Sequence, residues 1–433
     1  MKQISAIAII LLLSIIIMPA SLQAQDTQKT YDSKPGLSRF KMSGYTHSGF
    51  QYVNEDNKSD NNFVGGSFNP ILMYKQSDRL FFEAEFEGAF EDGEFQWALE
   101  FADISYIIND YMTIRVGQFL IPLGVFGEKL HPAWINRLAT KPLGFGHDGI
   151  APTNDIGVEL RGAFYAGSIK LNYQAYVING PQLKEGSAEP DEAGMLNFGY
   201  RSDNNPNKTF GGRLGIFPFT NSSTEIGFSG QTGIVGTEGT RYEDVSANLL
   251  AVDFSFVKPV KFLKSLIDIK AQYNYSSVTD ADYSGVEEEA GDVAGAKFAG
   301  NGLGSRTEDP GGSEEPIIGD LVNPYSFENI SNSYYVQLSI RPSLLKNEFF
   351  KNLEIAGRWS QITTPEGAAW EGDKSRASIG LNYWFDWKTT LKIGYSVTAG
   401  DSKSVGSNDK ENPNALGLPP QNNLFYIHWA MGF

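Results

Sequence analysis

Glutamates recur at every second position in one stretch of the chain. Glu83, Glu85 and Glu87 alternate there with aromatic and small apolar residues between positions 80 and 90. A period of two places the carboxylates on one face of a β-strand and the apolar residues on the other. Carboxylates facing lipid would be costly, whereas an apolar outer face is what a bilayer requires, so the acidic face must line water. The sequence therefore predicts ionisable groups inside a water-filled barrel.

The same alternation assigns further ionisable residues to the inner face of the predicted strands. The acidic group is Glu83, Glu85, Glu87, Glu100 and Glu159, together with Glu225 and Glu354, and Glu85 is expected directly opposite Glu100. The basic group is Arg115, Arg161, Lys170, Arg213, Arg341, Arg358 and Arg376, together with Lys270 and Lys392. A basic wall facing an acidic one would orient dipolar solutes without strict selection of anions.

The sequence gives little support for enzyme catalysis. No Gly-x-Ser-x-Gly elbow or His-Glu-x-x-His zinc motif is present, and the chain has no cysteine for a disulfide or a thiolate metal site. We expect no enzyme activity, no catalytic residue, no cofactor and no dedicated metal site. His47 and His428 face inward on the first and last strands and could bind a divalent metal or titrate together. The alternative, which we favour, is that both are polar wall residues, because the sequence does not set their relative height.

The elements that must position these residues are short segments in which apolar and polar residues alternate, separated by turn residues. They predict an all-β fold, a transmembrane antiparallel β-barrel of about sixteen strands. Connections after even-numbered strands are mostly short, and those after odd-numbered strands are mostly longer, as in barrels with periplasmic turns and extracellular loops. The strands are expected at residues 39–52, 63–76, 80–90, 95–101, 112–116, 155–165, 168–178, 208–217, 224–231, 242–257, 266–276, 333–341, 353–362, 375–385, 390–398 and 424–433. Among the predicted long loops are 54–62, 119–154, 179–207, 277–332 and 399–422.

The N-terminal residues have the pattern of a secretory signal. Lys2 is followed by an apolar run and by small residues up to Ala24, so we expect residues 1–24 to be removed, 25–38 to be a short periplasmic segment and 39–433 to form the barrel. The formal net charge of −16 becomes about −17 without the single charge of Lys2, which argues against nucleic-acid partners. No uncharged apolar run of about 18 residues follows Ala24, which excludes a helical membrane protein.

The C-terminal ten residues alternate in the same way as the strands before them. Trp429, Met431 and Phe433 share one apolar face of this stretch. An apolar terminal strand in a soluble β-sandwich would be an unprotected edge, whereas a closed barrel has no edge. The aromatic ending also resembles the signal by which the barrel-assembly machinery recognises outer-membrane barrels.

Several motifs give the chain a family resemblance. Arg115-Val116-Gly117-Gln118-Phe119, Ile121-Pro122-Leu123-Gly124, Asn154-Asp155-Ile156-Gly157-Val158-Glu159-Leu160, Val177-Ile178-Asn179-Gly180-Pro181 and the terminal strand resemble the phosphate-selective porin O and P family. The resemblance implies a sixteen-stranded porin in the outer membrane of a Gram-negative bacterium. It also implies a homotrimer, contacts with outer-membrane lipid and lipopolysaccharide, and an anion or phosphate preference. Members of the family fold the third extracellular loop inward to constrict the pore.

Residues 119–154 hold the position of that third loop. The segment contains Pro and Gly at several positions and carries Glu128, Lys129, His131, Arg137, Lys141 and His147. If the loop folds into the lumen, these charges lie where the pore is narrowest and where their field is least screened. The alternative is an extracellular lid with solvated charges.

Two functions remain open from the sequence. The first is a porin for the passive diffusion of small hydrophilic solutes, anionic or neutral, with some charge preference. The second is a barrel whose long loops 179–207 and 277–332 bind a partner or ligand, the pore being incidental. Loop 277–332 is rich in carboxylates and could bind divalent cations loosely with lipopolysaccharide, although a solvated loop is the interpretation that we favour.

Overall fold

The computed structural model describes residues 39–55, 58–91, 94–146, 149–186, 190–199, 202–284, 324–402 and 422–433. The predicted signal peptide and the segment 25–38 lie outside these ranges, as do His147 and most of the acidic loop 277–332.

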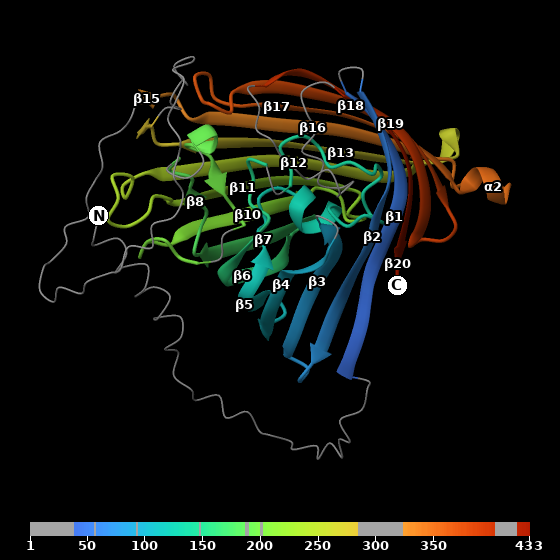
Figure 1. Cartoon of the computed structure of the whole chain (residues 1–433). Coiled ribbons are helices and arrows are strands. Elements are labelled where there is room, and N and C mark those ends of the chain that lie inside the picture. The colour runs from blue at the N-terminus through green and yellow to red at the C-terminus, as the bar shows by residue number, and fades with distance from the viewer. Residues whose placement is uncertain are drawn as a thin grey trace, which may run out of the picture. The chain divides into compact units, whose positions relative to one another are not determined.

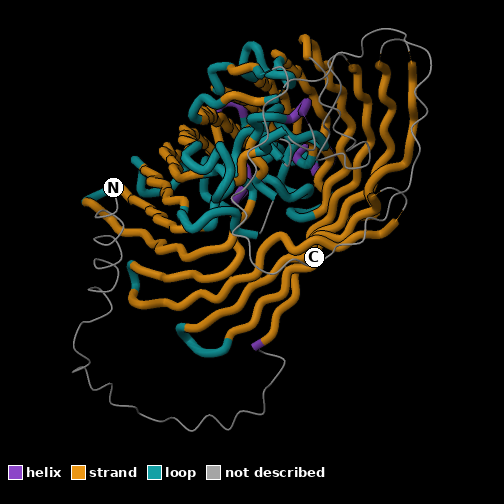
Figure 2. Tube along the Cα trace, turned by 60° about the vertical axis from the view of Figure 1, so that its left-hand side comes forward, coloured by secondary structure: helices purple, strands orange, loops and turns teal. Residues whose placement is uncertain are grey.

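The described residues form a closed antiparallel barrel in which each strand pairs with the next one of the wall and β20 pairs with β1 (Figures 1 and 2). This confirms the predicted fold class, and all sixteen predicted strands have a counterpart. The wall consists of β1 (Phe40–Glu55), β2 (Lys58–Lys75), β3 (Leu80–Glu91), β4 (Glu94–Asn109), β5 (Met112–Leu120), β6 (Asn154–Ala166), β7 (Ile169–Ile178), β10 (Thr209–Phe217), β11 (Thr224–Ile234), β12 (Ser246–Val260), β13 (Ser265–Val278), β16 (Ile330–Arg341), β17 (Leu353–Thr363), β18 (Gly372–Trp384), β19 (Thr389–Ser402) and β20 (Asn422–Gly432).

Smaller elements occupy the connections. Two short two-stranded sheets lie in the long connections, one from β8 (Gln182–Leu183) and β9 (Leu196–Asn197) and one from β14 (Asp282–Tyr283) and β15 (Tyr325–Ser326). The helical pieces are η2 (Phe126–Leu130), η3 (Pro190–Glu192), η4 (Lys261–Leu263) and α2 (Glu348–Lys351). Every helix that the described residues form is too short or too polar to span a membrane.

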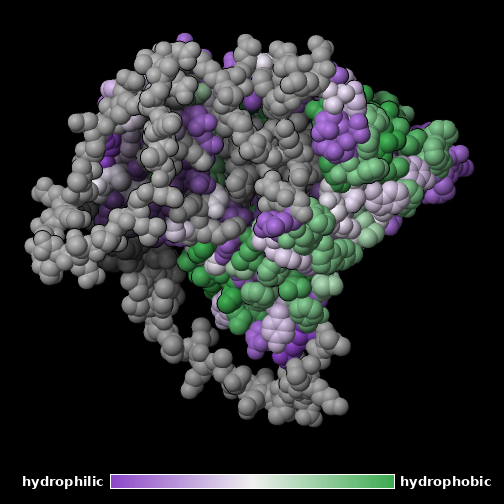
Figure 3. All heavy atoms as spheres, in the orientation of Figure 1, coloured by the Kyte–Doolittle hydropathy of each residue, from purple (hydrophilic) through white to green (hydrophobic). Residues whose placement is uncertain are grey.

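Side chains alternate between an exposed apolar outer face and a buried polar inner face. In β18, Ile379 and Leu381 are exposed, whereas their neighbours Ser378 and Asn382 are buried. The same pattern runs through β19 and β20, and apolar side chains cover much of the outer surface in Figure 3. Lipid solvates such a face and water solvates the inner one, so the barrel belongs in the outer membrane of a Gram-negative bacterium.

The predicted long loop at residues 54–62 is wrong. β1 continues to Glu55 and β2 begins at Lys58, and these two residues face each other across a tight hairpin. Asn61 and Asn62 pair with Tyr52 and Gln51 as ordinary strand residues. A run of polar residues indicates a loop only where a strand would need one apolar face. Both faces of this hairpin can be polar where it extends beyond the bilayer, so its polar residues do not mark a loop.

The expected pairing of Glu85 with Glu100 is also wrong. Glu85 pairs with Phe101, and the register then shifts so that Phe86 pairs with Leu99. Glu100 is therefore the extra residue of a β-bulge, which re-aims its side chain relative to a regular ladder. A simple count of alternate positions cannot locate such an insertion.

The outer face can be tested at the centre of one strand. Ile379 lies near the middle of β18 and is 58% exposed. We expect Ile379→Lys to lower the free energy of unfolding by about 2–4 kcal/mol, the typical cost of a lysine near the bilayer midplane. Guanidinium unfolding in phosphatidylcholine vesicles, followed by tryptophan fluorescence, measures this change. Ile379→Val is the matched control, and equal stability of the two variants would contradict a lipid-facing position.

Candidate functional site

The segment between β5 and β6 folds into the barrel. Its base extends the β5–β6 ladder by a hydrogen bond from the Ile121 amide to the Thr153 carbonyl (3.0 Å). Figure 2 shows loops, in teal, gathered within the curve of the strands. The segment then turns at Gly124, whose φ of +74° favours glycine and where a Cβ would meet the side chain of Gln272. We call residues 121–153 the inward loop.

Uncharged polar side chains of the wall hold the first part of the inward loop. The Gly124 amide donates to Ser229 Oγ on β11 (2.8 Å). The amides of Val125 and Phe126 both donate to Gln272 Oε1 on β13 (2.8 and 2.9 Å). These amides begin the single turn η2 and would otherwise lack partners, so the wall side chains fix where the turn starts.

Three cations of the wall hold the second part of the inward loop. Arg358 on β17 donates to the carbonyl and the hydroxyl of Thr140. Arg376 on β18 donates to the Lys141 carbonyl (3.3 Å), and Lys392 on β19 donates to the carbonyls of residues 133 and 136. Arg358, Arg376 and Lys392 are at most 4% exposed. They point inward as the alternation predicts, but they contact the loop backbone.

The other predicted cations of the wall are engaged as well. Among the described residues, their ion pairs are Arg115 with Glu159 (2.9 Å) and Asp103 (3.9 Å), Arg161 with Glu128 (3.0 Å) and Glu159 (3.6 Å), Arg213 with Asp253 (2.7 Å) and Glu225 (2.9 Å), and Lys270 with Asp268 (2.7 Å). Lys170 lies over the Phe217 ring, and Arg341 donates to the Lys351 carbonyl and to Asn352. Most of the inward positive charge is therefore already neutralised or hydrogen-bonded.

Charges of the inward loop pair with the wall in the same way. Lys129 contacts Glu225 (3.3 Å), and Arg137 contacts Glu354 (3.1 Å) and Asp268 (3.4 Å). The predicted loop residue His147 lies outside the described residues. These pairs fasten the loop to β11, β13 and β17, so the inward position is set by side chains from several strands.

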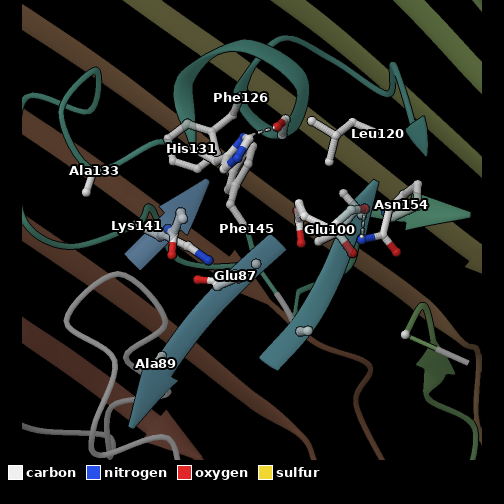
Figure 4. Close-up of a pocket in the computed structure, with 18 of the residues that line it drawn as sticks. Glu87, Ala89, Glu100, Leu120, Phe126, His131, Ala133, Lys141, Phe145 and Asn154 are labelled. Carbon is white, nitrogen blue, oxygen red and sulfur yellow. Dashed lines mark hydrogen bonds between the residues drawn. The ribbon is translucent and has the colours of Figure 1, made fainter. Parts of the chain in front are cut away.

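A cavity of about 430 Å³ remains between the inward loop and the wall of β1 to β4. Glu87 and Glu100 line it from the wall, and His131, Lys141 and Phe145 line it from the loop (Figure 4). The Glu100 backbone carbonyl accepts a hydrogen bond from Asn154 Nδ2 (2.9 Å), which joins the bulged strand to the base of β6. Of the other predicted acidic residues, Glu83 is exposed, whereas Glu85 and Glu159 are buried in the wall.

His131 lines this cavity as a neutral side chain. Its Nδ1 atom lies 2.6 Å from the Gly127 carbonyl, and its buried Nε2 atom has no hydrogen-bond partner among the described residues. Burial first and the charge of Lys141 second lower the pKa of His131 to about 4. At neutral pH the ring adds no positive charge to the cavity.

The two histidines at the seam of the barrel meet, which the sequence could not establish. The rings of His47 and His428 are 5.0 Å apart between centroids. Lys392 pairs with His428 across the ladder, and in the described part of the chain no group of three histidines or carboxylates could hold a metal. The two rings thus lie side by side in the wall where β1 pairs with β20.

Several contact residues were missed by the sequence reasoning. Asp103, Asp253 and Asp268 neutralise wall cations, and Ser229 and Gln272 hold the loop amides. Ser229, Asp253, Asp268 and Gln272 occupy inward alternate positions, so for these four the alternation itself was the available signal. Asp103 follows the bulge at Glu100, which shifts the alternation of β4 by one residue. Nothing in the sequence indicated which of them would contact a loop more than a hundred residues away.

Comparisons with known proteins support the fold. No family model matches this chain. A 171-residue stretch is 28% identical to an uncharacterised protein of Aquifex aeolicus (strain VF5), and the match covers 36% of this chain and 35% of the relative. The match thus spans about a third of the length of that relative (35%).

Three similar solved structures illustrate the likeness, each at low sequence identity. They include the outer-membrane channel DcaP of Acinetobacter baumannii (TM-score 0.53, 12% identity, covering 91% of this chain and 97% of that one), the anion-selective porin from Comamonas acidovorans (0.52, 10%, 91% and 99%) and OmpF of Salmonella typhi in complex with daunomycin (0.52, 11%, 91% and 97%). The chain has the fold of outer-membrane porins. The narrower likeness to phosphate-selective porins stays a prediction.

The role of the wall cations can be tested on the loop that they hold. We expect Arg358→Met and Lys392→Met to reduce the protection of loop amides 133–141 against hydrogen exchange by about tenfold or more, since each removes charged hydrogen bonds to the loop. Exchange followed by mass spectrometry on the refolded barrel gives the readout. Lys388→Met, in the turn between β18 and β19, is the control. Unchanged exchange in both loop variants would show that other contacts hold the segment.

The neutral state of His131 predicts a pH dependence of the same loop. A released His131 titrates near the ordinary value of 6.5, whereas the packed one titrates at about 4. Between these values the released state binds more protons, so the stability of the packed loop falls as the pH drops from 6.5 toward about 4. Exchange rates corrected for intrinsic chemistry should show this loss in the wild type. The loss should be smaller in His131→Asn, and an equal loss would assign the effect to other groups.

Proposed function

We propose that this chain is an outer-membrane porin through which small hydrophilic solutes diffuse passively. The observation that carries the proposal is the cavity between the inward loop and β1–β4, lined by ionisable side chains inside a lipid-facing barrel. A barrel of this size has room for an aqueous passage. The protein contributes a shaped and charged path, and the solute gradient supplies the driving force, so the proposal includes no cofactor and no catalysis.

The inward loop would set both the width and the field of the passage. Packed against β11 to β19, it leaves open the space beside the acidic wall. Glu87 and Glu100 lie on one side of that space and Lys141 on the other, and such a separation orients a dipolar solute as it passes. The field is strongest there because little water screens it.

An anion or phosphate preference is the narrower form of this proposal. The resemblance in sequence motifs supports it, and one structurally similar protein is described as an anion-selective porin. The engagement of Arg358, Arg376 and Lys392 by the loop backbone favours unspecific diffusion instead. The charge preference is therefore a property to measure.

Assembly as a homotrimer in contact with lipid and lipopolysaccharide belongs to the same proposal. Recognition by the barrel-assembly machinery through Trp429, Met431 and Phe433 is a further part of the proposal. Trp429 and Met431 are exposed on the outer face, and the Phe433 ring stacks on Phe68 with 5.8 Å between centroids. The Phe433 amide also donates to the Gly44 carbonyl (2.9 Å), so the last residue closes the barrel against β1.

A second candidate function rests on the packing of the long connections. Tyr242, Tyr283, Phe327 and Trp370 come from three connections, with Tyr283 and Phe327 both in the one between β13 and β16. They form one buried cluster, with Tyr242 stacked on Tyr283 at 5.5 Å. A packed platform of this kind could present a binding surface to a partner. The acidic stretch 285–323 lies outside the described residues.

Planar-bilayer recording tests the porin proposal directly. The refolded barrel should give stable single-channel currents in potassium chloride, and deletion of residues 285–323 should leave a conducting channel. A loop-binding protein would lose its partner with that deletion whether or not it conducts. Correct folding is checked in each preparation by heat-modifiable migration in gels. A folded full-length barrel that gives no current would overturn the porin proposal.

A further inference from the structure

Two arginines on neighbouring strands carry positive charge into a place where no negative charge meets it. Arg358 on β17 and Arg376 on β18 are 4% and 2% exposed, and the two strands run side by side (Figure 1). In the part of the chain that the structure describes, no carboxylate forms an ion pair with either of them. Their hydrogen bonds go to neutral oxygen atoms, which satisfy N–H groups but do not neutralise a buried charge.

The two guanidinium groups also reach the same short piece of the inward loop. Arg358 donates to the Thr140 carbonyl, and Arg376 donates to the carbonyl of the next residue, Lys141 (3.3 Å). Consecutive Cα atoms are only about 3.8 Å apart, so two like charges are brought close together. Repulsion between like charges is strong where water is excluded. A negative ion placed between them would replace this repulsion by attraction.

Three buried hydrogen-bonding groups at adjacent positions have no partner. Arg358 Nε, Arg376 Nη2 and Ser360 Oγ form no hydrogen bond with any described residue, and Ser360 is 1% exposed. Ser360 lies directly opposite Arg376 in the β17–β18 ladder, and it follows Arg358 by two residues on the same inward face. All three groups can donate, and two of them are charged. Buried donors are normally satisfied, so this arrangement points to an acceptor that binds among them.

The inward loop closes this place toward the lumen. Leu138, Ala139 and Thr140 are at most 1% exposed. A Cβ at Gly380 on β18 would meet Leu138 Cδ2 at 2.8 Å, so the glycine allows Leu138 to lie against the wall. An acceptor beneath the loop is thus shielded from bulk water. A water molecule could satisfy the N–H groups there, but it would leave both charges uncompensated.

We propose that Arg358, Arg376 and Ser360 hold a resident monovalent inorganic anion, chloride, beneath the inward loop. The ion would neutralise the guanidinium pair and help to hold residues 138–141 against β17 and β18. A single-atom ion can accept from all three donors, whereas a phosphate has four oxygen atoms that need partners. The site is separate from the cavity beside β1–β4, so the ion is a part of the folded barrel and not a solute in transit.

Anomalous diffraction tests the site directly. Bromide replaces chloride in halide sites and can be located by its absorption edge, so crystals of the refolded full-length barrel would be grown in sodium bromide. We expect an anomalous peak within hydrogen-bonding distance of Arg358 Nε, Arg376 Nη2 and Ser360 Oγ. Density for a water only, without an anomalous peak, would overturn the proposal.

Hydrogen exchange tests the effect of the ion on the loop in solution. Sodium chloride would be titrated against sodium gluconate at constant ionic strength, and the exchange of amides 138–141 followed by mass spectrometry. Protection should rise to a plateau, by about tenfold at a chloride concentration about ten times the half-saturating one. Sodium phosphate at the same ionic strength should not replace chloride. Protection that is independent of chloride, or that phosphate restores and chloride does not, would contradict the proposal.

A serine variant separates ion binding from the contacts that the arginines make with the loop. Ser360→Ala removes one donor to the ion and should raise the half-saturating chloride concentration by about tenfold, with protection restored at saturating chloride. Ser276→Ala, at another buried inward serine on β13, is the matched control and should titrate as the wild type does. Arg376→Gln should abolish the chloride response. Identical titrations of the two serine variants would remove Ser360 from the site and overturn the proposal.

This inference and the porin proposal fail separately. The anion site depends on the packing of the inward loop and not on conduction. A conducting channel with no bromide peak and no chloride dependence would overturn the anion site and leave the porin proposal standing. A folded barrel with a bromide peak but no current would do the reverse. Heat-modifiable migration in gels checks the folding of each variant before either measurement.

Discussion

The interior of this barrel depends on three buried cations of the wall that donate hydrogen bonds to oxygen atoms of the inward loop. Arg358, Arg376 and Lys392 sit on adjacent strands, and no ion pair to any of them occurs among the described residues. A buried charge without a partner is strongly unfavourable, so these residues require the inward loop as much as the loop requires them. The backbone of residues 133–141 supplies oxygen atoms at the places where the wall supplies donors. This reciprocal requirement places the loop on one side of the lumen.

The place of the loop decides which residues meet a solute. Contacts from Ser229, Gln272 and the three cations hold the loop against β11 to β19, so the free space lies against β1 to β4. The acidic stretch of β3, with the bulge at Glu100, thereby becomes the open wall of the cavity. The chemistry of the passage is thus set by contacts on the opposite side of the barrel. A substitution among the wall cations that hold the loop would therefore alter the shape of the cavity, although these cations do not line it.

Sequence reasoning succeeded where the determining signal lies within one strand. Alternation is a local property, because each strand must satisfy lipid on one face and water on the other, and it located all the strands of the wall. It failed where the answer needs a partner strand or the third dimension. The tight hairpin at Glu55 and Lys58, the bulge at Glu100 and the meeting of His47 with His428 all depend on register between strands. The contacts of Gln272 with the loop depend on a chain path that no local pattern encodes.

This distinction explains why a count of inward charges is a poor guide to ion preference in this fold. The alternation places arginines and lysines around much of the wall, and taken alone they would suggest a path for anions. In the folded chain, ion pairs with carboxylates engage Arg115, Arg161 and Arg213. Hydrogen bonds to loop carbonyls engage Arg358, Arg376 and Lys392. An ion pair or a charged hydrogen bond removes most of the field that a passing solute would feel. What a solute meets is therefore decided by the side chains that line the cavity, among them Glu87, Glu100 and Lys141, and not by the number of inward arginines and lysines.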